Sequence, residues 1–289
     1  MKGIVLAGGL GSRLYPITLS TSKQLLSVYD KPLIYYPLSI LFLAGIKDIL
    51  IICTEKDLNS YKNLLGDGSR FGVKFSYIIQ KKPEGLPQAF TLGEKFIGND
   101  NVCLVLGDNI FYSDNLINSL EESKKMTSQN KCVIYGYYVN NPESFGVIEY
   151  DGINEDVLSL EEKPKKPKSN YAAIGLYFFP NSVIKYSKEI SKSSRGEYEI
   201  ISVLNKYLDN KQLKSVKCGR GFSWFDSGTP DSLLEAANFI SILENNIGKK
   251  IACLEEISVY KRFISHSLML KKNKKYVNKE YFNYLKKLK

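Results

Sequence analysis

A glycine-rich turn directly after the first apolar run of the chain could bind phosphate groups. Residues 7–14 read AGGLGSRL and follow a β-rich stretch that begins at Lys2. Glycines let backbone N–H groups approach anionic oxygens closely, and Arg13 would add a forked positive charge. A Walker A loop is excluded because no Gly-Lys-Ser or Gly-Lys-Thr follows, and a dinucleotide fingerprint fits only in part because Leu14 replaces its third glycine. Phosphate binding and a purely structural tight turn remain open.

Three further charged residues could complete a phosphate site. Lys23 follows Arg13 by ten residues and is flanked by uncharged residues. By composition alone it would be a surface lysine, but because the glycine turn is so near we interpret it as a second triphosphate contact. Asp108 stands just past the apolar run Val102–Leu106, and Asp226 lies in a turn before a helical pattern. Mg²⁺ prefers one or two carboxylates together with substrate phosphate oxygens, which two strand-end aspartates from distant segments could provide. Either aspartate alone could also cap a helix.

The elements that must position these residues alternate between strands and helices over the first 110 residues. This alternation is typical of βαβ units, so the sequence predicts an α/β fold with a mostly parallel central sheet. Open α/β sheets bind ligands at the carboxyl ends of their strands, which is where the glycine turn and Asp108 fall. The expected strands are Lys2–Ala7, Asp48–Cys53, 73–79 and Val102–Leu106, and the expected helices are 32–44, ended by Gly45, 56–65 and 86–96.

Strand patterns dominate beyond residue 131, separated by turn-forming Asn-Asn-Pro, Asp-Gly and Lys-Pro sequences. Helical periodicity returns at 199–208 and at 230–243, where Thr229 is the expected N-cap and Pro230 the first helical residue. We therefore expect one α/β domain over residues 1–246 and a short helical, basic tail over residues 247–289. The strands expected in the second half are 132–139, Gly146–Tyr150, 157–160 and 172–179.

The formal net charge of +10 is concentrated in this tail. Residues 261–289 hold ten basic residues against one acid, Glu280, a net of +9, which leaves about +1 for the rest of the chain. The tail could contact nucleic acid or a membrane surface, but its aromatic residues favour a solvated helix that packs on the body or on a neighbouring subunit. We therefore expect no nucleic-acid partner. The aromatic residues concerned are Tyr276, Tyr281, Phe282 and Tyr284.

Cysteine spacing and hydropathy indicate the compartment. The five cysteines stand singly, without the short paired spacing of zinc or thioredoxin-like redox sites, which favours a reducing, cytoplasmic environment. The longest apolar stretch, residues 33–44, is shorter than the roughly 20 residues that cross a bilayer. The N-terminus lacks the context of a signal peptide and reads as a first buried strand. We expect no membrane association.

A series of segments along the chain matches, in order, the motifs of one enzyme family. They are GIVLAGGLGSRLYPIT, SKQLLSVYDKPLIYYPLSILFLAGIKDILII, GDGSRFGV, QKKPEGLPQAF, LVLGDNIFY, SFGVIEY, LEEKPKKPKSNYA, GLYFF, SRGEYEI and WFDSGTPDSLLEA. In these segments the chain resembles the bacterial glucose-1-phosphate thymidylyltransferases, which belong to the sugar-nucleotidyltransferase group. The resemblance covers essentially the whole chain.

This resemblance implies both a fold and a reaction. The fold would be a Rossmann-like nucleotidyltransferase core with a β-rich sugar-binding part. The reaction would join dTTP to glucose 1-phosphate with the help of Mg²⁺, releasing pyrophosphate and giving dTDP-glucose for dTDP-rhamnose and related sugars. Members of the family tend to be homotetramers that the pathway end product inhibits at a separate site.

The resemblance also implies roles for individual residues. Asp108 and Asp226 match the metal-binding aspartates, and Gln80 and Gly85 match the positions that hold the thymine edge, where a glutamine offers both a donor and an acceptor. The expected catalytic residues are Arg13, Lys23, Asp108, Lys163 and Asp226. The expected nucleotide contacts are Leu6, Gly8, Gly9, Gly11, Ser12, Arg13, Lys23, Gln80, Gly85 and Asp108. The expected sugar-phosphate contacts are Asn109, Phe145, Gly146, Glu162, Lys163, Ala173 and Arg195.

At five positions the chain departs from the usual family pattern. Phe145 and Ile174 lose polar atoms that we expect near the sugar pocket, so the choice of hexose stays open, whereas Ser12 keeps a hydroxyl. The departures are Leu10 for serine, Ser12 for threonine, Tyr15 for histidine, Phe145 for tyrosine and Ile174 for threonine.

The expected chemistry is an in-line attack of the sugar phosphate oxygen on the α-phosphorus of the nucleotide. A phosphate whose second pKa is about 6 is largely ionised at neutral pH, so this nucleophile needs no general base. The single histidine, His266, lies in the tail and is expected to be a surface residue. Three alternatives remain: UTP or another sugar 1-phosphate as substrate, a non-catalytic nucleotide-sugar-binding protein, and a nucleic-acid binder acting through the tail.

Overall fold

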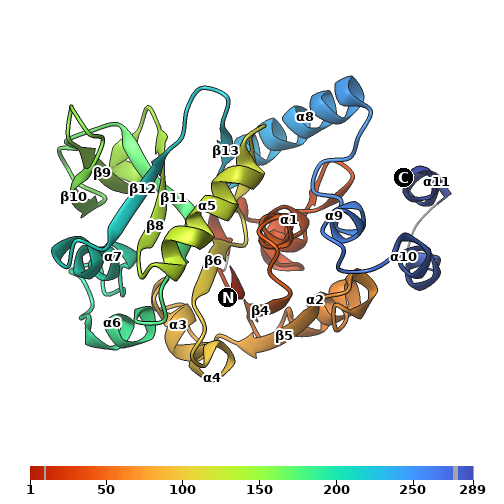
Figure 1. The fold of residues 1–289 in the computed structure, drawn as a ribbon, viewed down its shortest axis with the longest axis horizontal. Helices are drawn as coiled ribbons and strands as arrows, with labels where there is room; N and C mark the ends of the chain where they lie inside the picture. The colour runs from red at the N-terminus through yellow and green to blue at the C-terminus, as the bar shows by residue number, and fades with distance from the viewer. Residues whose placement is uncertain (10, 276–278, 289) are drawn as a thin grey trace.

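A nine-stranded mixed β-sheet forms the centre of the fold in the computed structural model, which describes residues 1–9, 11–275 and 279–288 (Figure 1). Leu10 and Tyr276 lie outside the described residues. The main path of the sheet is β10-β9-β11-β6-β1-β4-β5, and β8 joins β11 to β12. The strands are β1 Lys2–Ala7, β4 Asp48–Cys53, β5 Lys74–Ile79, β6 Val102–Leu106, β8 Cys132–Tyr138, β9 Gly146–Tyr150, β10 Val157–Glu162, β11 Tyr171–Phe179 and β12 Leu213–Lys217.

The predicted parallel core of the sheet is confirmed. Strand β1 pairs in parallel with both β4 and β6, and β4 pairs in parallel with β5. Ala7 lies opposite Cys53, and Cys53 lies opposite Ile79, so these strands end at one common edge. Antiparallel pairing on both sides of β11 and between β9 and β10 makes the sheet mixed. Among the nine described strands of this sheet, only β10 and β11 therefore run against the common direction.

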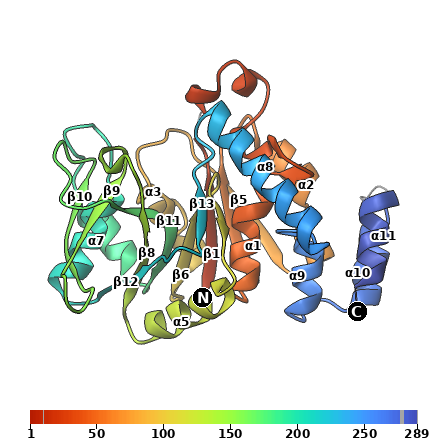
Figure 2. The same ribbon diagram turned by 90° about the horizontal axis from the view of Figure 1, so that it is seen from above.

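Helices cover both faces of the sheet and complete a three-layer α/β/α arrangement (Figure 2). The apolar residues of one face pack with α1, α2, α5 and α9, and those of the other face pack with α3, α4, α6 and α7. The helices are α1 Tyr35–Leu43, α2 Leu58–Leu65, α3 Gln88–Leu92, α4 Glu94–Ile97, α5 Leu116–Ser128, α6 Val183–Glu189, α7 Ile200–Asp209, α8 Pro230–Ile247 and α9 Leu254–Tyr260.

The helices predicted over 56–65 and 230–243 are observed as Leu58–Leu65 and Pro230–Ile247, and two further predicted helices differ for reasons that the structure shows. The first begins at Tyr35 rather than at residue 32, because residues 31–32 form strand β3 (Lys31–Pro32), which pairs with β2 (Ser27–Val28). The helix expected over 86–96 is two short helices that meet at Gly93. A side chain at Gly93 would come within 2.8 Å of the Ala89 carbonyl, so this junction needs a glycine.

The predicted C-terminal end of helix α1 and the predicted start of helix α8 are confirmed. Gly45 follows α1 with φ 75°, the left-handed conformation that glycine adopts most easily. The Thr229 hydroxyl accepts from the Ser232 N–H at 3.2 Å, and the Ser232 hydroxyl accepts from the Thr229 N–H at 3.0 Å. This reciprocal cap fixes where α8 starts, a few residues after Asp226.

The C-terminal tail folds against α9 as helices α10 (His266–Asn273) and α11 (Lys279–Lys287) (Figure 2). Tyr281 Oη donates to Glu255 Oε2 at 2.9 Å, and Tyr284 Oη donates to Glu256 Oε2 at 2.5 Å. Both aromatics therefore pack on α9, which itself lies within residues 247–289, so their packing on the body stays a prediction. The expectation of a surface His266 is wrong, because this ring is half-buried and lies 2.8 Å from the Leu285 carbonyl.

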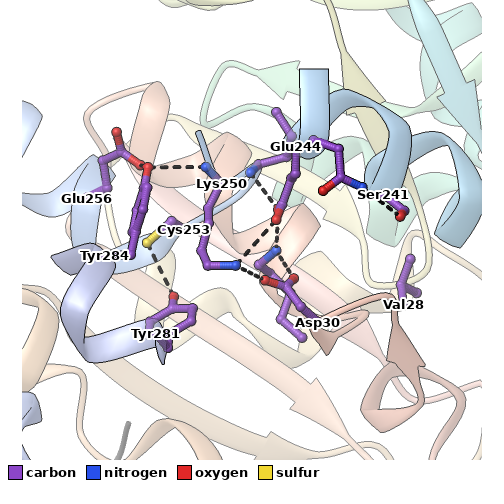
Figure 3. A network of polar contacts seen from close by, with 12 residues as sticks. Val28, Asp30, Ser241, Glu244, Lys250, Cys253, Glu256, Tyr281 and Tyr284 are labelled. Atoms are coloured by element: carbon purple, nitrogen blue, oxygen red, sulfur yellow. Dashed lines mark hydrogen bonds and ion pairs between the residues drawn. The ribbon is translucent and has the colours of Figure 1, made fainter. Parts of the chain in front are cut away.

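A buried ion network fastens the β2–β3 ribbon to helix α8 (Figure 3). Lys31 Nζ lies 2.9 Å from Glu244 Oε1 and also pairs with Asp30, while Lys250 Nζ pairs with Asp30 and with Glu244 Oε2 at 3.3 Å. The side chains of Lys31 and Glu244 are only 3% and 7% exposed. Burial alone would raise the pKa of Asp30, but the charges and hydrogen bonds of Lys31 and Lys250 lower it below its ordinary value. The two positive groups, Lys31 and Lys250, and the two negative groups, Asp30 and Glu244, thus neutralise each other's charge in a region with little access to water.

Glu244→Gln is expected to lower the free energy of unfolding by about 3 kcal/mol, because removing one member of a buried ion pair leaves its partner charge uncompensated. Urea unfolding followed by circular dichroism measures the change. Asn246→Ala, an exposed change in the last turn of the same helix, is the matched control. Equal midpoints for the two variants would contradict a stabilising network.

Candidate functional site

A cleft of about 1510 Å³ opens at the carboxyl edge of the parallel strands, between the glycine turn and the β-rich half. It brings together fifteen of the eighteen residues proposed from the sequence. A smaller hollow of about 590 Å³ beside α6 contains none of them. The predicted residues that line the cleft are Leu6, Gly9, Ser12, Arg13, Gln80, Gly85, Asp108, Asn109, Phe145, Gly146, Glu162, Lys163, Ala173, Arg195 and Asp226.

The remaining three predicted residues, Gly8, Gly11 and Lys23, lie just behind the wall of the cleft. Gly11 has φ 62°, and its carbonyl accepts from Thr18 Oγ1 at 2.9 Å. A side chain at Gly8 would stand 2.1 Å from Gln80 Oε1, so only glycine leaves room for that amide. The glycine turn therefore shapes the cleft from behind as well as at its surface.

Lys23 joins the two predicted aspartates. Its side chain is almost fully buried, and its Nζ donates to Asp108 Oδ2 at 2.7 Å and to the Asp226 backbone carbonyl at 3.2 Å. The Asp226 carboxylate itself accepts from the Gly228 N–H at 3.1 Å. The guanidinium of Arg13 packs against Gly228, where an added side chain would meet Nη2 at 2.7 Å. Two cationic and two anionic side chains from three distant segments thus converge at one end of the cleft.

The donor set at this point suits a hard cation. The described residues contain no cluster of three or more histidine, cysteine, aspartate or glutamate side chains that could hold a metal ion alone. Asp108 and Asp226 offer oxygen ligands only, and the position between Asp108 and the Asp226 carbonyl already holds the positive ammonium of Lys23. Such a site can hold Mg²⁺ only together with further oxygen ligands, as substrate phosphates provide.

Asn109 fixes the orientation of Asp108. It is buried, and its Oδ1 accepts from Trp224 Nε1 at 2.7 Å and from the Gly175 N–H at 3.2 Å. Its Nδ2 consequently faces Asp108 Oδ1 and donates to it at 2.9 Å. Trp224, the one tryptophan of the chain, was not predicted as a site residue, although its place two residues before Asp226 was a usable signal.

The far end of the cleft carries a cluster of acids around one arginine. Arg195 Nη1 lies 3.2 Å from Glu162 Oε1 and 3.4 Å from Glu199 Oε1. The pKa of Glu162 is raised, first by burial and then by the charge of Glu199, while Lys163 and Arg195 oppose the shift. The backbone of Lys163 is left-handed, with φ 43°, and its N–H donates to the Phe145 carbonyl at 2.9 Å. Glu199 was not predicted as a site residue, although it stands four residues after Arg195 in the same segment.

Phe145 and Ile174 are the two positions where the chain has an apolar residue in place of the family's polar one. Phe145 faces the cleft, whereas Ile174 faces the core. Phe145 lines the cleft and packs edge-on against Trp224, with ring centroids 5.4 Å apart. Ile174 is 1% exposed and packs in the core, because side chains alternate along β11 and its neighbours Ala173 and Gly175 take the cleft side. The expectation that Ile174 borders the sugar pocket is therefore wrong.

Gln80 and Gly85 form a further part of the cleft wall. Gln80 is buried, and its Nε2 donates to Gln88 Oε1 at 2.6 Å. Gly85 has φ 119°, and a side chain there would come 2.0 Å from the Tyr198 carbonyl. Gln88 was missed from the sequence, since a glutamine in the first turn of a helix carries no functional signal.

Arg195→Met is expected to raise the pKa of Glu162 further, because the opposing positive charge is lost while burial and Glu199 remain. Carbon-detected NMR titration of the glutamate carboxyl groups measures this shift. Lys185→Met, on the exposed side of α6, should leave the Glu162 titration unchanged. A Glu162 curve identical in all three proteins would show that Arg195 does not act on it.

The chain is similar to known proteins over its whole length. Residues 2–242 match the protein family described as nucleotidyl transferase. A glucose-1-phosphate thymidylyltransferase of Neisseria meningitidis is 49% identical over 288 residues, which cover 100% of this chain and 99% of that protein. A second, from Mycobacterium tuberculosis, is 49% identical over 285 residues, covering 99% of this chain and 98% of the relative.

Solved structures agree in fold. A crystal structure from Bacillus anthracis, assigned as a glucose-1-phosphate thymidylyltransferase and holding sucrose, is 41% identical with a TM-score of 0.76, and the match covers 83% of this chain and 94% of the other. A UDP-glucose pyrophosphorylase complexed with UDP-glucose has a TM-score of 0.73 at 24% identity, covering 84% of this chain and 98% of that one. The latter likeness concerns the fold alone.

Proposed function

Because the chain belongs to the nucleotidyl transferase family, we propose that it is a glucose-1-phosphate thymidylyltransferase, which joins dTTP to glucose 1-phosphate and releases pyrophosphate. One observation carries the proposal: the glycine turn, Arg13, Lys23, Asp108 and Asp226 converge at one end of the cleft. Positive groups and backbone N–H groups at a sheet edge suit a nucleoside triphosphate.

The two substrates would occupy opposite ends of the cleft. Residues of the glycine turn with Arg13 and Lys23 would hold the triphosphate, and Gln80 and Gly85 would face the base. The sugar phosphate would lie against the β-rich half, where Glu162 can accept from sugar hydroxyls and the exposed Lys163 can neutralise phosphate. The further residues proposed on the sugar side are Asn109, Phe145, Gly146, Ala173 and Arg195.

Mg²⁺ is the metal that this site fits. Asp108 and Asp226 would hold it with the substrate phosphates, because both offer hard oxygen ligands from the same end of the cleft. When bound, Mg²⁺ neutralises phosphate charge and orients the phosphate oxygens.

The reaction is an in-line displacement at the α-phosphorus. An oxygen of the sugar phosphate forms the new bond to phosphorus, the bond from the α-phosphorus to the bridging oxygen breaks, and pyrophosphate leaves with that oxygen. The nucleophile is already ionised, which agrees with a cleft lined by no histidine: His266 is bound to Leu285 in the tail. Arg13 and Lys23 would stabilise the growing charge of the leaving pyrophosphate, and the cleft walls would align the reactants.

We also propose, from the family resemblance, a homotetramer that works in the cytoplasm. Leu234 and Ile242 of α8 are 61% and 60% exposed, which supports contacts between copies, and all five cysteines are free, which supports a reducing compartment. In the part of the chain that the structure describes, no helix is both long and apolar enough to span a bilayer. Light scattering on the purified protein measures the assembly.

A substrate panel tests the proposed reaction. With Mg²⁺ present, pyrophosphate release is expected to be fastest with dTTP and glucose 1-phosphate, and removal of the metal by a chelator should abolish it. Preference for UTP or for glucosamine 1-phosphate would keep the chemistry and change the substrates. No release with any pair would favour a non-catalytic binding protein.

Asp108→Asn and Asp226→Asn are each expected to lower turnover by about 10²-fold or more, the scale of losing one preorganised electrostatic group. Steady-state pyrophosphate release at saturating substrates measures the loss. Asp209→Asn, at the exposed end of α7, serves as a control that keeps normal turnover. Near-normal turnover in either cleft variant would remove that aspartate from the metal site.

A further inference from the structure

Gln80, Gln88 and Glu84 form a chain of hydrogen bonds behind the base end of the cleft. Gln80 Nε2 donates to Gln88 Oε1 at 2.6 Å, and Gln88 Nε2 donates to Glu84 Oε2 at 3.2 Å. The backbone N–H of Glu84 donates to the same Gln88 Oε1 at 3.2 Å. Two amide side chains are thus held by one residue that offers both a carboxylate and an N–H group.

The orientation of the two amide groups in this series of hydrogen bonds is determined by neighbouring groups that can only donate or only accept. An ionised carboxylate only accepts hydrogen bonds, and a backbone N–H only donates them. Lys192 Nζ lies 2.7 Å from Glu84 Oε1, and its hydrogen bond and charge lower the pKa of Glu84, so this group stays ionised at neutral pH. Turning the Gln88 amide over would place its NH₂ against the Glu84 N–H and its oxygen against the carboxylate. Gln88 must therefore present its oxygen to Gln80.

The orientation of the Gln88 amide in turn fixes the orientation of the Gln80 amide. If its amide turned over, its oxygen would face Gln88 Oε1 across a 2.6 Å gap, which puts two acceptors together. In the observed orientation Gln80 Oε1 lies over Gly8 at the wall of the cleft, in space that any other residue at position 8 would fill. The side chain is 5% exposed, so water compensates little for a wrong orientation.

We propose that Gln88 is a positioning residue that sets the choice of nucleobase by locking the direction of the Gln80 amide. The inference rests on the proposed function, in which Gln80 faces the base. With its oxygen held over Gly8, Gln80 accepts from the N3–H of an imide pyrimidine and can offer its second N–H to a neighbouring carbonyl.

Thymine and uracil both carry this pattern of an N3–H donor between two carbonyl acceptors. Cytosine carries an N3 acceptor beside an amino donor, which would match Gln80 only with its amide reversed. The hydrogen bonds from Glu84 through Gln88 to Gln80 thus allow the two imide bases to bind and exclude cytosine. Gln88 has this effect although it does not line the cleft.

Gln88→Leu tests the proposal, because leucine has a similar size and no acceptor to hold Gln80. The kcat/KM values for dTTP, UTP and dCTP with glucose 1-phosphate are measured by pyrophosphate release. The ratio of dTTP to dCTP is expected to fall by about tenfold or more, the scale of one buried hydrogen bond that decides between orientations. The ratio of dTTP to UTP should stay unchanged, because both bases present the same imide edge.

Two further variants keep the test decisive. Gln88→Glu combined with Glu84→Gln still offers an acceptor to Gln80 Nε2 without placing two carboxylates together, so this double variant is expected to keep the dTTP to dCTP ratio even if its activity falls. Thr91→Val removes a hydrogen bond to the Gln88 carbonyl at 3.1 Å on the same helix without touching the amide chain, so it should keep all three ratios.

A parallel loss with all three nucleotides in Gln88→Leu, or an unchanged dTTP to dCTP ratio, would overturn the proposal. An equal relaxation of base choice in the double variant of Gln88→Glu with Glu84→Gln would also overturn it. These outcomes can be distinguished from a failure of the proposed function itself, because in that case even the unmodified protein would release no pyrophosphate from dTTP.

Discussion

The buried ammonium group of Lys23 is the interaction on which the cleft depends. A charge with so little access to water must be paired, and Lys23 finds its partners in the Asp108 carboxylate and the Asp226 carbonyl. These groups lie on segments that no local interaction connects, so one ammonium holds three parts of the chain at the same point. The arrangement also makes this end of the cleft a place where positive and negative groups are already balanced before a triphosphate arrives.

Rigid elements support each of those segments from behind. The chain that carries Lys23 leads into the β2–β3 ribbon, where Lys31 pairs with Glu244 inside the protein. Helix α8 carries Glu244 in its last turns and is capped by Thr229 shortly after Asp226. Two of the three segments that meet at Lys23 are therefore attached to α8. The segment that carries Lys23 is held near the C-terminal end of the helix, and the segment that carries Asp226 leads into its N-terminal end. The ion network around Asp30, Glu244 and Lys250 (Figure 3) thus holds the C-terminal end of α8, while Asp226 lies just before the N-terminal end of the same helix.

Orientation by groups of fixed polarity recurs on both sides of the cleft. Asn109 is turned by the Trp224 and Gly175 N–H groups so that its NH₂ faces Asp108, and Gln88 is turned by Glu84 so that its oxygen faces Gln80. In each case an amide that could adopt two orientations is left with one, because a donor-only or acceptor-only neighbour decides between them. Such groups let the site present a defined pattern of donors and acceptors to its substrates without any side chain having to change its orientation.

The sequence alone determined the elements that depend on local pattern. Continuous apolar runs located β1, β4 and β6 to the residue, the cap at Thr229 located the start of α8, and the ordered motifs identified fifteen residues of the cleft wall. Only the tertiary structure decided what depends on a partner elsewhere in the chain. The core position of Ile174 and the Lys31 pair with Glu244 follow from close approaches between distant segments. The helix break at Gly93 and the hydrogen bond between Gln88 and Gln80 depend on local three-dimensional geometry that the residue types do not reveal. Residue type and spacing do not predict such contacts, because a glutamine or a lysine is equally common on a solvated surface.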